Sequence, residues 1–392
     1  MLTSIAIILL LGYVSGWLFS KMKLPSLIGM ILLGICIGPY ALNVLDSSLL
    51  EISSSIRQVA LVIILTRAGL SLNLEDLKRV GRPAILMCFV PACFEMLGIV
   101  LLGPLLFDIS LVEALVIGTV VAAVSPAVIV PRMISLIDQG YGKEHSIPQL
   151  ILAAASVDDI FVIVVFTVAT SLALTNEVSM LRFVEIPVSI ILGILLGIVT
   201  GMLVVKFYQK VSMRKVVQVF VLLSISFLLL EVETLLKGLV PVSGLLAIMA
   251  TGMYIKQKDN AMAIFLANPY SQLWSVGEVF LFVLVGACVN IQYAMNAGIL
   301  VILLVCLSLV FRMVGVWISL MKSPLTAKER VFCMIAYTPK ATVQASIGAI
   351  PLSMGLACGE LVLTVAVLSI LLTAPFGALG IDALHKRLLK TL

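Results

Sequence analysis

The chain has 392 residues, of which 62% are hydrophobic and 11% are charged, and its formal net charge is +5. A soluble protein needs more polar surface than this to cover its core, so the composition excludes a soluble globular protein. Apolar runs long enough to cross about 30 Å of hydrocarbon as helices recur along the whole chain, which predicts an all-α polytopic membrane protein.

The first apolar run, residues 3–19, has a length that suits either a signal peptide or a membrane span. It lacks a basic n-region and no small-x-small cleavage site follows it, so we predict a true span. The seven cysteines all lie in apolar runs without C-x-x-C spacing, which is typical of small apolar side chains rather than of disulfides or a metal site. Both histidines, His145 and His385, lie in a loop or the tail, so we expect no catalytic or metal site built on histidine.

Apolar runs separated by charge clusters predict 13 transmembrane helices. They cover residues 3–20, 24–44, 54–73, 83–107, 111–137, 147–174, 184–207, 216–232, 238–256, 271–290, 295–321, 329–353 and 360–384. With these spans, 19 of the 25 Lys and Arg residues fall on one face, three on the other and three within spans. Because Lys and Arg are enriched in cytoplasmic loops, this asymmetry predicts an outside N-terminus and a cytoplasmic C-terminus.

Two of the predicted spans contain proline near the middle. The fifth span contains 124-VSPAVIVP-131, with Pro126, and the twelfth contains 338-TPKATVQASIGAIP-351, with Thr338 and Pro339. Proline removes a backbone donor and clashes with the preceding turn, so each helix is expected to break there. A mere kink is the simpler alternative for either helix alone, but breaks at equivalent places in two halves favour a binding site at the membrane midplane.

The sequence also carries a weak internal repeat. At an offset of 217 residues, 94-FEMLGI-99 aligns with 311-FRMVGV-316, and 62-VIILTRAGLSLN-73 aligns with 279-VFLFVLVGACVN-290. At an offset of 213, 125-SPAV-128 aligns with 338-TPKA-341, and Pro25–Gly38 loosely resembles Pro241–Gly252. Together these pairs equate spans two to five with spans nine to twelve. Seven helices separate each pair, so the halves insert in opposite directions, which predicts two inverted repeats with crossed discontinuous helices.

Five ionisable residues are predicted to lie deep in the membrane. Asp158 and Asp159 are near the middle of the sixth span, Glu95 and Arg312 occupy repeat-equivalent positions, and Lys340 lies at the second break. A charge at this depth is costly unless it is paired or hydrated, so each is either functional or part of a tight ion pair.

The expected pairing leaves one acid over. We predict a structural salt bridge between Glu95 and Arg312 and a second pair between Asp158 and Lys340. Neighbouring residues on a helix point about 100° apart, so Asp159 remains as the ion-binding group. One proton or one monovalent cation on Asp159 would neutralise the cluster, and competition between the two ions produces exchange. The predicted ion-binding site comprises Asp159, Asp158 and Ser125, with Asp159 and Asp158 as the ligands of the metal cation (Na⁺ or Li⁺) and Lys340, Arg312 and Glu95 as supporting charges.

At these residues the sequence resembles sodium/proton antiporters of the cation:proton antiporter superfamily, and their NHA-type branch most closely. The strings that carry the resemblance are 66-TRAGLSLN-73, 124-VSPAVIVPRM-133, 138-DQGYGKEHSIPQLILAAASVDDI-160 and 338-TPKATVQASIG-348. The resemblance extends over nearly the whole chain.

The resemblance implies an NhaA-like antiporter fold. Residues 1–80 and 214–292 would form a dimerisation domain, residues 81–175 and 293–392 a core transport domain, and residues 176–213 a linker helix. It further implies a homodimer in the inner (plasma) membrane that exchanges Na⁺ or Li⁺ for H⁺ by an elevator-like movement and contributes to pH regulation. No cofactor, nucleic-acid partner or enzymatic activity is implied.

Electrogenic relatives carry a lysine where this chain has Arg312, which cannot lose its proton, so the resemblance implies one-for-one exchange. Release of a second proton from an Asp158–Lys340 pair is the alternative. Other functions are a K⁺/H⁺ antiporter, a sodium-coupled symporter for an organic anion, a channel, and a membrane enzyme or sensor. A compact acidic site argues against the symporter and the channel, and the chain lacks catalytic residues and a soluble output domain.

Overall fold

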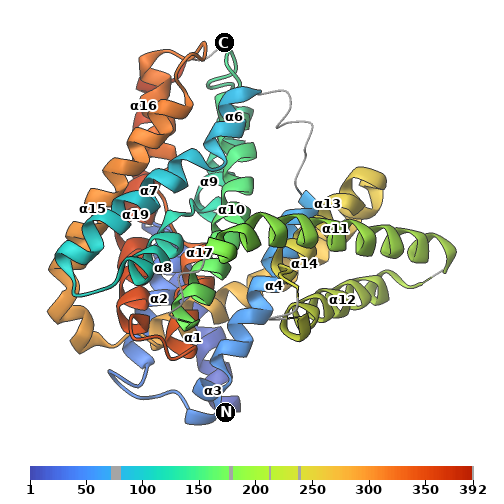
Figure 1. Cartoon of the computed structure of the whole chain (residues 1–392), viewed down its shortest axis with the longest axis horizontal. Helices are drawn as coiled ribbons and strands as arrows, with labels where there is room; N and C mark the ends of the chain where they lie inside the picture. Colours follow the sequence, from blue (N-terminus) through green and yellow to red (C-terminus); the bar gives the residue numbers. More distant parts are fainter. Residues whose placement is uncertain (72–80, 176–179, 212, 237–239, 391–392) are drawn as a thin grey trace. The chain divides into compact units, whose positions relative to one another are not determined.

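The computed structural model describes residues 1–71, 81–175, 180–211, 213–236 and 240–390, and every regular element in these residues is an α-helix. Lys78, Arg79 and Lys237, which enter the charge count, lie outside the described residues, as do Asn73 of the repeat and the domain boundaries placed at residues 80 and 176. The chain divides into two compact units (Figure 1). Unit 1 comprises residues 1–54, 74–174 and 279–392, and unit 2 comprises residues 55–73 and 175–278.

Most of the helices belong to unit 1. They are α1 (Leu2–Lys21), α2 (Ser26–Ile37), α3 (Ser47–Glu51), α6 (Arg82–Met87), α7 (Val90–Leu106), α8 (Leu111–Ala122), α9 (Pro126–Asp138), α10 (Ile147–Thr175), α15 (Ile291–Ser319), α16 (Ala327–Ala336), α17 (Thr342–Ile347), α18 (Ile350–Ser353) and α19 (Gly359–Leu388). Unit 2 is built from α4 (Ser53–Ser71), α11 (Met180–Lys210), α12 (Lys215–Leu236), α13 (Gly244–Lys258) and the first part of α14 (Asn260–Ala287).

Nine helical segments in the described part of the chain are long and apolar enough to cross a membrane, and two of them, Arg82–Leu106 and Leu111–Asp138, each join two consecutive helices. Each of the 13 predicted ranges contains helix, but the number of spans remains a prediction. The predicted span 24–44 is wrong at its end, because α2 stops at Ile37 where Gly38 is extended and Pro39 follows. The predicted span 83–107 is interrupted at Cys88 and Phe89, since Pro91 is placed in the first turn of a new helix, α7.

The helices α7 and α15 pack through residues that the internal repeat equates. A Cβ atom at Gly98 would lie 2.8 Å from the ring of Phe311, and one at Gly315 would lie 3.1 Å from the Cβ of Phe94. Gly98 and Gly315 are repeat partners, and so are Phe94 and Phe311. Each half therefore supplies a glycine that receives the phenylalanine of the other half, which is the reciprocal contact expected where two inverted repeats meet at their pseudo-twofold axis.

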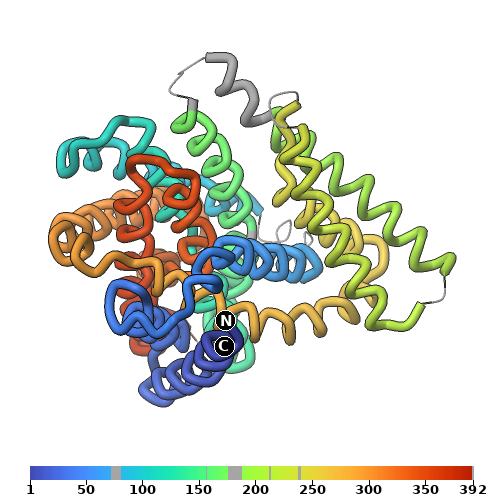
Figure 2. Tube along the Cα trace, turned by 90° about the horizontal axis from the view of Figure 1, so that it is seen from below, coloured from blue at the N-terminus to red at the C-terminus, as the bar shows by residue number. Residues whose placement is uncertain are grey.

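The tube view shows α15 and α19 of unit 1 beside one another, in orange and red (Figure 2), and residues of the two helices are in contact. Buried side chains of α19 follow one another at almost every position between Leu361 and Val367, so this helix is enclosed rather than lipid-facing along that stretch. It provides a packed support beside both segments that the prolines interrupt.

Unit 2 is held by close backbone contacts at glycine. A Cβ atom at Gly193 would lie 2.8 Å from the carbonyl of Ser243, and one at Gly201 would lie 2.9 Å from the Cβ of Tyr254, so α11 and α13 approach closely. Gly252 of α13 likewise lies against Gly69 of α4. Small residues at such positions let helix backbones pack tightly in a membrane, where the hydrophobic effect gives no driving force between helices.

Candidate functional site

The first helix break consists of Ala123, Val124 and Ser125, between the end of α8 and the start of α9. All three residues are fully buried, and the backbone of Ala123 and of Ser125 is extended. Pro126 begins α9, where its missing N–H would have had no partner within the helix in any case. The break therefore leaves the last carbonyls of α8 and the N–H groups of Val124 and Ser125 without hydrogen-bond partners within a helix.

The second helix break runs from Tyr337 to Ala341, between α16 and α17. The Thr338 hydroxyl donates to the carbonyl of Ile335, and the N–H of Lys340 donates to the Thr373 hydroxyl on α19 at 2.9 Å. The N–H of Ser125 donates to the carbonyl of Pro339 at 2.8 Å. The two breaks thus cross and are joined directly, backbone to backbone.

Asp158 lies on α10, which runs without interruption past the crossing. Its side chain is completely buried, and Oδ2 accepts hydrogen bonds from the N–H of Val124 at 2.9 Å and from Arg312 Nη2 at 3.0 Å. Asp158 Oδ1 has no hydrogen-bond partner among the described residues. One oxygen of this carboxylate therefore fastens α10 to the first break, and the other is left available.

Asp159 follows on the same helix and points away from Asp158 by about 100°. Its Oδ1 is enclosed, without a hydrogen-bond partner in the part of the chain that the structure describes. No ion pair involves Asp159 within those residues. Two carboxylate oxygens, one from each aspartate, and the similarly enclosed hydroxyl of Ser125 thus have no hydrogen-bond partner among the described residues.

Arg312 on α15 is the centre of the charged cluster. Its Nη1 donates to Glu95 Oε2 at 2.9 Å and to the carbonyl of Ala122, its Nη2 donates to Asp158, and its Nε donates to the carbonyl of Tyr337 at 2.8 Å. The guanidinium also lies over the Tyr337 ring, 5.4 Å from its centroid. The predicted salt bridge between Glu95 and Arg312 is present, and the same side chain ties together both breaks and α10.

Lys340 does not pair with Asp158, and this part of the sequence prediction is wrong. Its Nζ contacts Glu95 at 2.8 Å from Oε1 and 2.9 Å from Oε2, and it donates to the carbonyl of Val121 at 2.6 Å. The ammonium is directed to the negative end of α8, whereas the forked guanidinium of Arg312 reaches two carboxylates at once. Glu95 therefore faces both cations, and Asp158 faces Arg312 alone.

Comparison with known proteins agrees with this geometry. The family described as "Sodium/hydrogen exchanger, transmembrane" matches residues 5–386. The chain belongs to the sodium/hydrogen exchanger family. It is 31% identical over 386 residues to "Sodium/hydrogen exchanger 9B2" of Homo sapiens, covering 94% of this chain and 70% of that protein. It is 30% identical to "Sodium/hydrogen exchanger 9B1" of Homo sapiens, covering 93% of this chain and 73% of that one.

The fold of this exchanger-family chain matches a solved antiporter structure. The sodium proton antiporter MjNhaP1 from Methanocaldococcus jannaschii at pH 8 aligns with a TM-score of 0.86 over 99% of this chain and 98% of that one, at 20% sequence identity. The predicted class, an all-α membrane protein with the antiporter fold, is therefore confirmed.

Several groups that hydrogen-bond to the charged cluster or to the first break of this exchanger were not identified from the sequence. They are the carbonyls of Val121, Ala122 and Ala123, the carbonyl of Tyr337, and the Gln344 side chain. Backbone groups carry no residue-type signal, so only the position of the break could have indicated them. Gln344 had a usable signal, since it is a strongly polar residue in the apolar segment that follows the second break.

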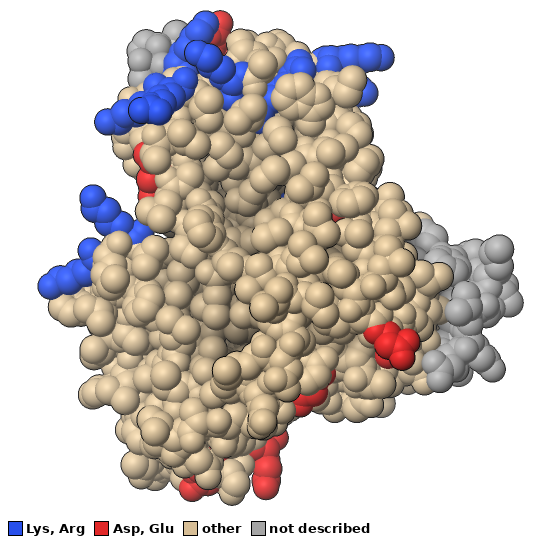
Figure 3. Space-filling view, turned by 90° about the vertical axis from the view of Figure 1, so that its left-hand side faces the viewer, with Lys and Arg blue, Asp and Glu red and all other residues tan. Residues whose placement is uncertain are grey.

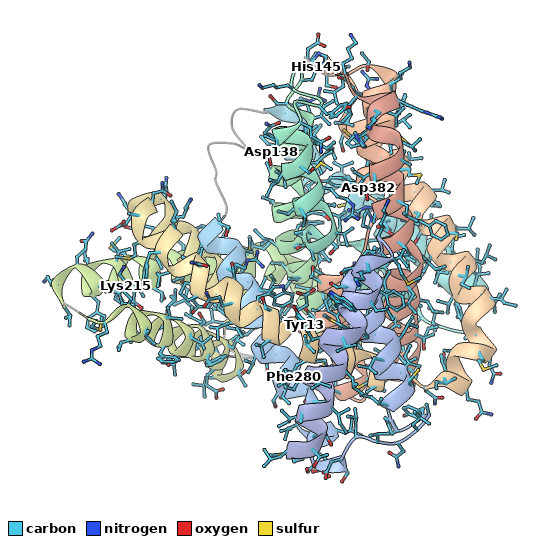
Figure 4. All side chains as sticks on the ribbon, turned by 180° about the vertical axis from the view of Figure 1, so that it is seen from behind. Tyr13, Asp138, His145, Lys215, Phe280 and Asp382 are labelled. Carbon is cyan, nitrogen blue, oxygen red and sulfur yellow. The ribbon has the colours of Figure 1, made fainter. Side chains whose placement is uncertain are left out.

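Both breaks also connect to ion pairs at one end of unit 1. His145, labelled beyond α9 in Figure 4, contacts Glu329 in the first turn of α16, with 3.0 Å between Nδ1 and Oε1. Arg132 on α9 pairs with Asp382 on α19, with 3.1 Å between Nε and Oδ1. Asp382 is labelled in Figure 4. These contacts join the loop after α9 to the start of α16, and the middle of α9 to α19.

Proposed function

We propose that this chain is a secondary transporter that exchanges Na⁺ for H⁺ across a membrane by alternating access. The observation that carries the proposal is the pairing of five charges, of which Glu95, Asp158, Arg312 and Lys340 are buried and Asp159 is partly buried. Glu95 and Asp158 face Arg312 and Lys340, while Asp159 has no protein cation beside it in the described residues. Two cations against three carboxylates leave one negative charge over.

A single buried negative charge can be neutralised by one proton or by one monovalent cation. The two ions compete for the same carboxylate, so the loading of one releases the other. Asp159 is the carboxylate we assign to this exchange, with Asp158 Oδ1 and Ser125 Oγ as neighbouring oxygen ligands. Na⁺ and Li⁺ suit such hard oxygen donors; K⁺ is the alternative cargo.

We propose one-for-one, electroneutral exchange. Arg312 keeps its proton, and Lys340 makes three contacts with acceptors, so neither is free to act as a second proton carrier. A sodium-coupled organic-anion symporter is not favoured, since the site offers unpaired acceptors rather than donors for an anion. Transport by this mechanism requires no cofactor and no enzymatic step.

Charge distribution supports the proposed orientation of unit 1. In Figure 3, many Lys and Arg residues gather at the end that carries the C-terminus, and Asp and Glu residues are found at the opposite end. Because Lys and Arg favour the cytoplasmic side, we propose a cytoplasmic C-terminus in the cell's inner (plasma) membrane. We also propose a homodimer with an elevator-like core movement, a division into dimerisation and core transport domains with the boundaries given above, and a role in pH regulation.

Asp159→Asn tests the proposed function. In proteoliposomes with an internal pH-sensitive dye and an imposed Na⁺ gradient, we expect the variant to lose exchange by a factor of at least about 100, because an amide offers no charge for either ion to neutralise. Asp138→Asn, an exposed aspartate at the end of α9, is the matched control and is expected to exchange normally (Figure 4). Normal exchange by folded Asp159→Asn would remove the assignment.

The stoichiometry is tested separately in the same vesicles. With the membrane potential clamped by K⁺ and valinomycin and then left free, a one-for-one exchanger runs at the same rate. A rate that follows the imposed voltage would contradict electroneutral exchange while leaving Asp159 as the site.

A further inference from the structure

Gln344 lies on α17, one helical turn beyond Lys340, and its side chain is fully buried. An uncharged polar residue in such a place needs hydrogen-bond partners, because a buried amide without them is costly. Its partners are in the opposite half of the molecule. Nε2 donates to the carbonyl of Ala123 at 2.8 Å and to the carbonyl of Val121 at 3.3 Å.

The orientation of the amide follows from these partners. Both contacts are carbonyl oxygens, which can only accept, so the nitrogen of the amide must face them. Gln344 Oε1 is enclosed without a hydrogen-bond partner among the described residues. The side chain therefore contributes donors to the first break and receives nothing that would compensate its own oxygen, which is unusual for a residue that only fills space.

The hydrogen bond from Gln344 to Ala123 is linked to Asp158 through one rigid peptide group. The carbonyl of Ala123 and the N–H of Val124 belong to the same planar peptide unit. Gln344 Nε2 holds the oxygen of this unit, and Asp158 Oδ2 accepts from its nitrogen at 2.9 Å. A donor on the carbonyl also polarises the peptide and strengthens its N–H as a donor to the carboxylate.

Gln344 is uncharged, unlike the other two side chains that donate to the carbonyls at the end of α8. Lys340 reaches the carbonyl of Val121 and Arg312 reaches that of Ala122, and both bring a positive charge that the acids balance. Gln344 reaches Ala123 without a charge. It can therefore fix the break while the negative charge assigned to Asp159 stays available for the transported ion.

We propose that Gln344 is a positioning residue of the cation site, which holds the Ala123–Val124 peptide and, through it, the orientation of the Asp158 carboxylate. This role rests on the proposed function. It predicts that loss of the amide weakens Na⁺ binding without removing the charge on which exchange depends.

Gln344→Leu is the test, since leucine keeps most of the volume and has no donor. In proteoliposomes, we expect the half-saturating Na⁺ concentration to rise about tenfold or more, while the rate at saturating Na⁺ stays within about twofold of wild type. The half-saturating Na⁺ concentration for thermal stabilisation of the detergent-solubilised protein gives a second readout that does not need transport, and we expect it to rise in parallel.

Ser346→Ala is the matched control. Ser346 is a buried polar residue on the same short helix, but its hydroxyl donates to the carbonyl of Thr342 within that helix. We expect both half-saturating concentrations to remain at the wild-type value in this variant. If Gln344→Leu does not fold, Gln344→Asn decides, because it keeps the amide one methylene further from Ala123, and we expect an increase of about threefold or more.

The outcomes distinguish the two proposals. If the wild-type chain exchanges and folded Gln344 variants keep the wild-type half-saturation, the positioning role is wrong and the proposed function stands. A lower maximal rate with unchanged half-saturation also contradicts positioning, since it indicates a general structural role. If the wild-type chain itself exchanges no Na⁺ for H⁺, the proposed function fails and the positioning role fails with it.

Discussion

The two helix breaks stand at related places in two inverted halves, yet they contribute different groups to the crossing. The first break, Ala123 to Ser125, contributes backbone: its peptide groups bind Asp158 and Pro339, and the adjoining carbonyls accept from side chains. The second break contributes side chains as well, because Lys340 lies within it and Gln344 follows it by one turn.

This difference shows how duplication can give an asymmetric site. A broken helix without charged side chains at its break exposes a negative carboxyl end, and a second broken helix carrying donors can cap it. Arg312 and Lys340 are therefore helix caps as well as counter-ions, so their loss should affect folding of the crossing in addition to the charge balance.

Arg312→Ala is the strongest test of this view. The change leaves Glu95 with Lys340 alone, Asp158 without a cation, and the carbonyls of Ala122 and Tyr337 without their donor. Removing one partner from a buried ion pair costs about 3–5 kcal/mol, and we expect a decrease of at least this size in the free energy of unfolding. Thermal unfolding in detergent measures it. A melting temperature equal to that of wild type would show that Arg312 does not hold the crossing.

Lys340→Met should cost less than Arg312→Ala. Glu95 keeps Arg312, and the carbonyl of Val121 keeps the Gln344 amide, so each group that loses Lys340 retains a donor. We expect a loss of about 1–3 kcal/mol, measured in the same unfolding experiment. A larger loss than in Arg312→Ala would mean that the second break, rather than α15, supplies the main cap.

Ser125→Ala tests the side-chain contribution of the first break. The N–H of residue 125 can still donate to Pro339, so the crossing should stay intact, and only the unpartnered hydroxyl is removed. A neutral ligand of this kind is worth about 1 kcal/mol, which corresponds to a rise of about fivefold in half-saturating Na⁺. An unchanged value would leave the first break with a role through its backbone alone.

Asp46→Asn gives the smallest effect and a baseline away from both breaks. Asp46 caps α3, and the Ser48 hydroxyl, the N-terminal ammonium and the Ser48 N–H lower its pKa from 3.8 to about 2. Because the folded-state pKa is depressed, the stabilising contribution is present above about pH 4 and is lost as the pH falls toward about 2. The melting temperatures of wild type and variant should therefore differ slightly at pH 7 and converge below about pH 4. We expect the pH profile of exchange above pH 5 to be unchanged in this variant. A shifted profile would place a pH-sensing group outside the breaks.

Much of the fold could be predicted from the sequence because the helix-breaking prolines and the predicted depth of the residues in the membrane agreed. Pro126 and Pro339 indicated where helices end, and α8 and α16 do end close before them. The offset of 217 residues predicted that Glu95 and Arg312 meet, and the reciprocal contacts of Gly98 and Gly315 have the same origin.

The partner of Lys340 could not be predicted from the sequence, because it depends on how far each side chain reaches in three dimensions. The choice between Asp158 and Glu95 as the partner of Lys340 is set by where the end of α8 lies and by how far the fork of Arg312 extends. Neither quantity is encoded in spacing along one helix. The early end of α2 and the interruption between α6 and α7 were missed for a related reason, since hydropathy alone continues across Gly38 and across Phe89.

The hydrogen bond from the Ser125 N–H to the Pro339 carbonyl has a mechanical consequence. The bond joins two main-chain groups, so neither a change of protonation nor the arrival of a cation removes its donor or its acceptor. A displacement of the proposed core transport domain that left this bond unbroken would move both half-helix pairs as one piece, with the proposed ion site intact. Access to the site would then alternate between the two sides of the membrane as this domain moves relative to the rest of the protein, without the crossing opening.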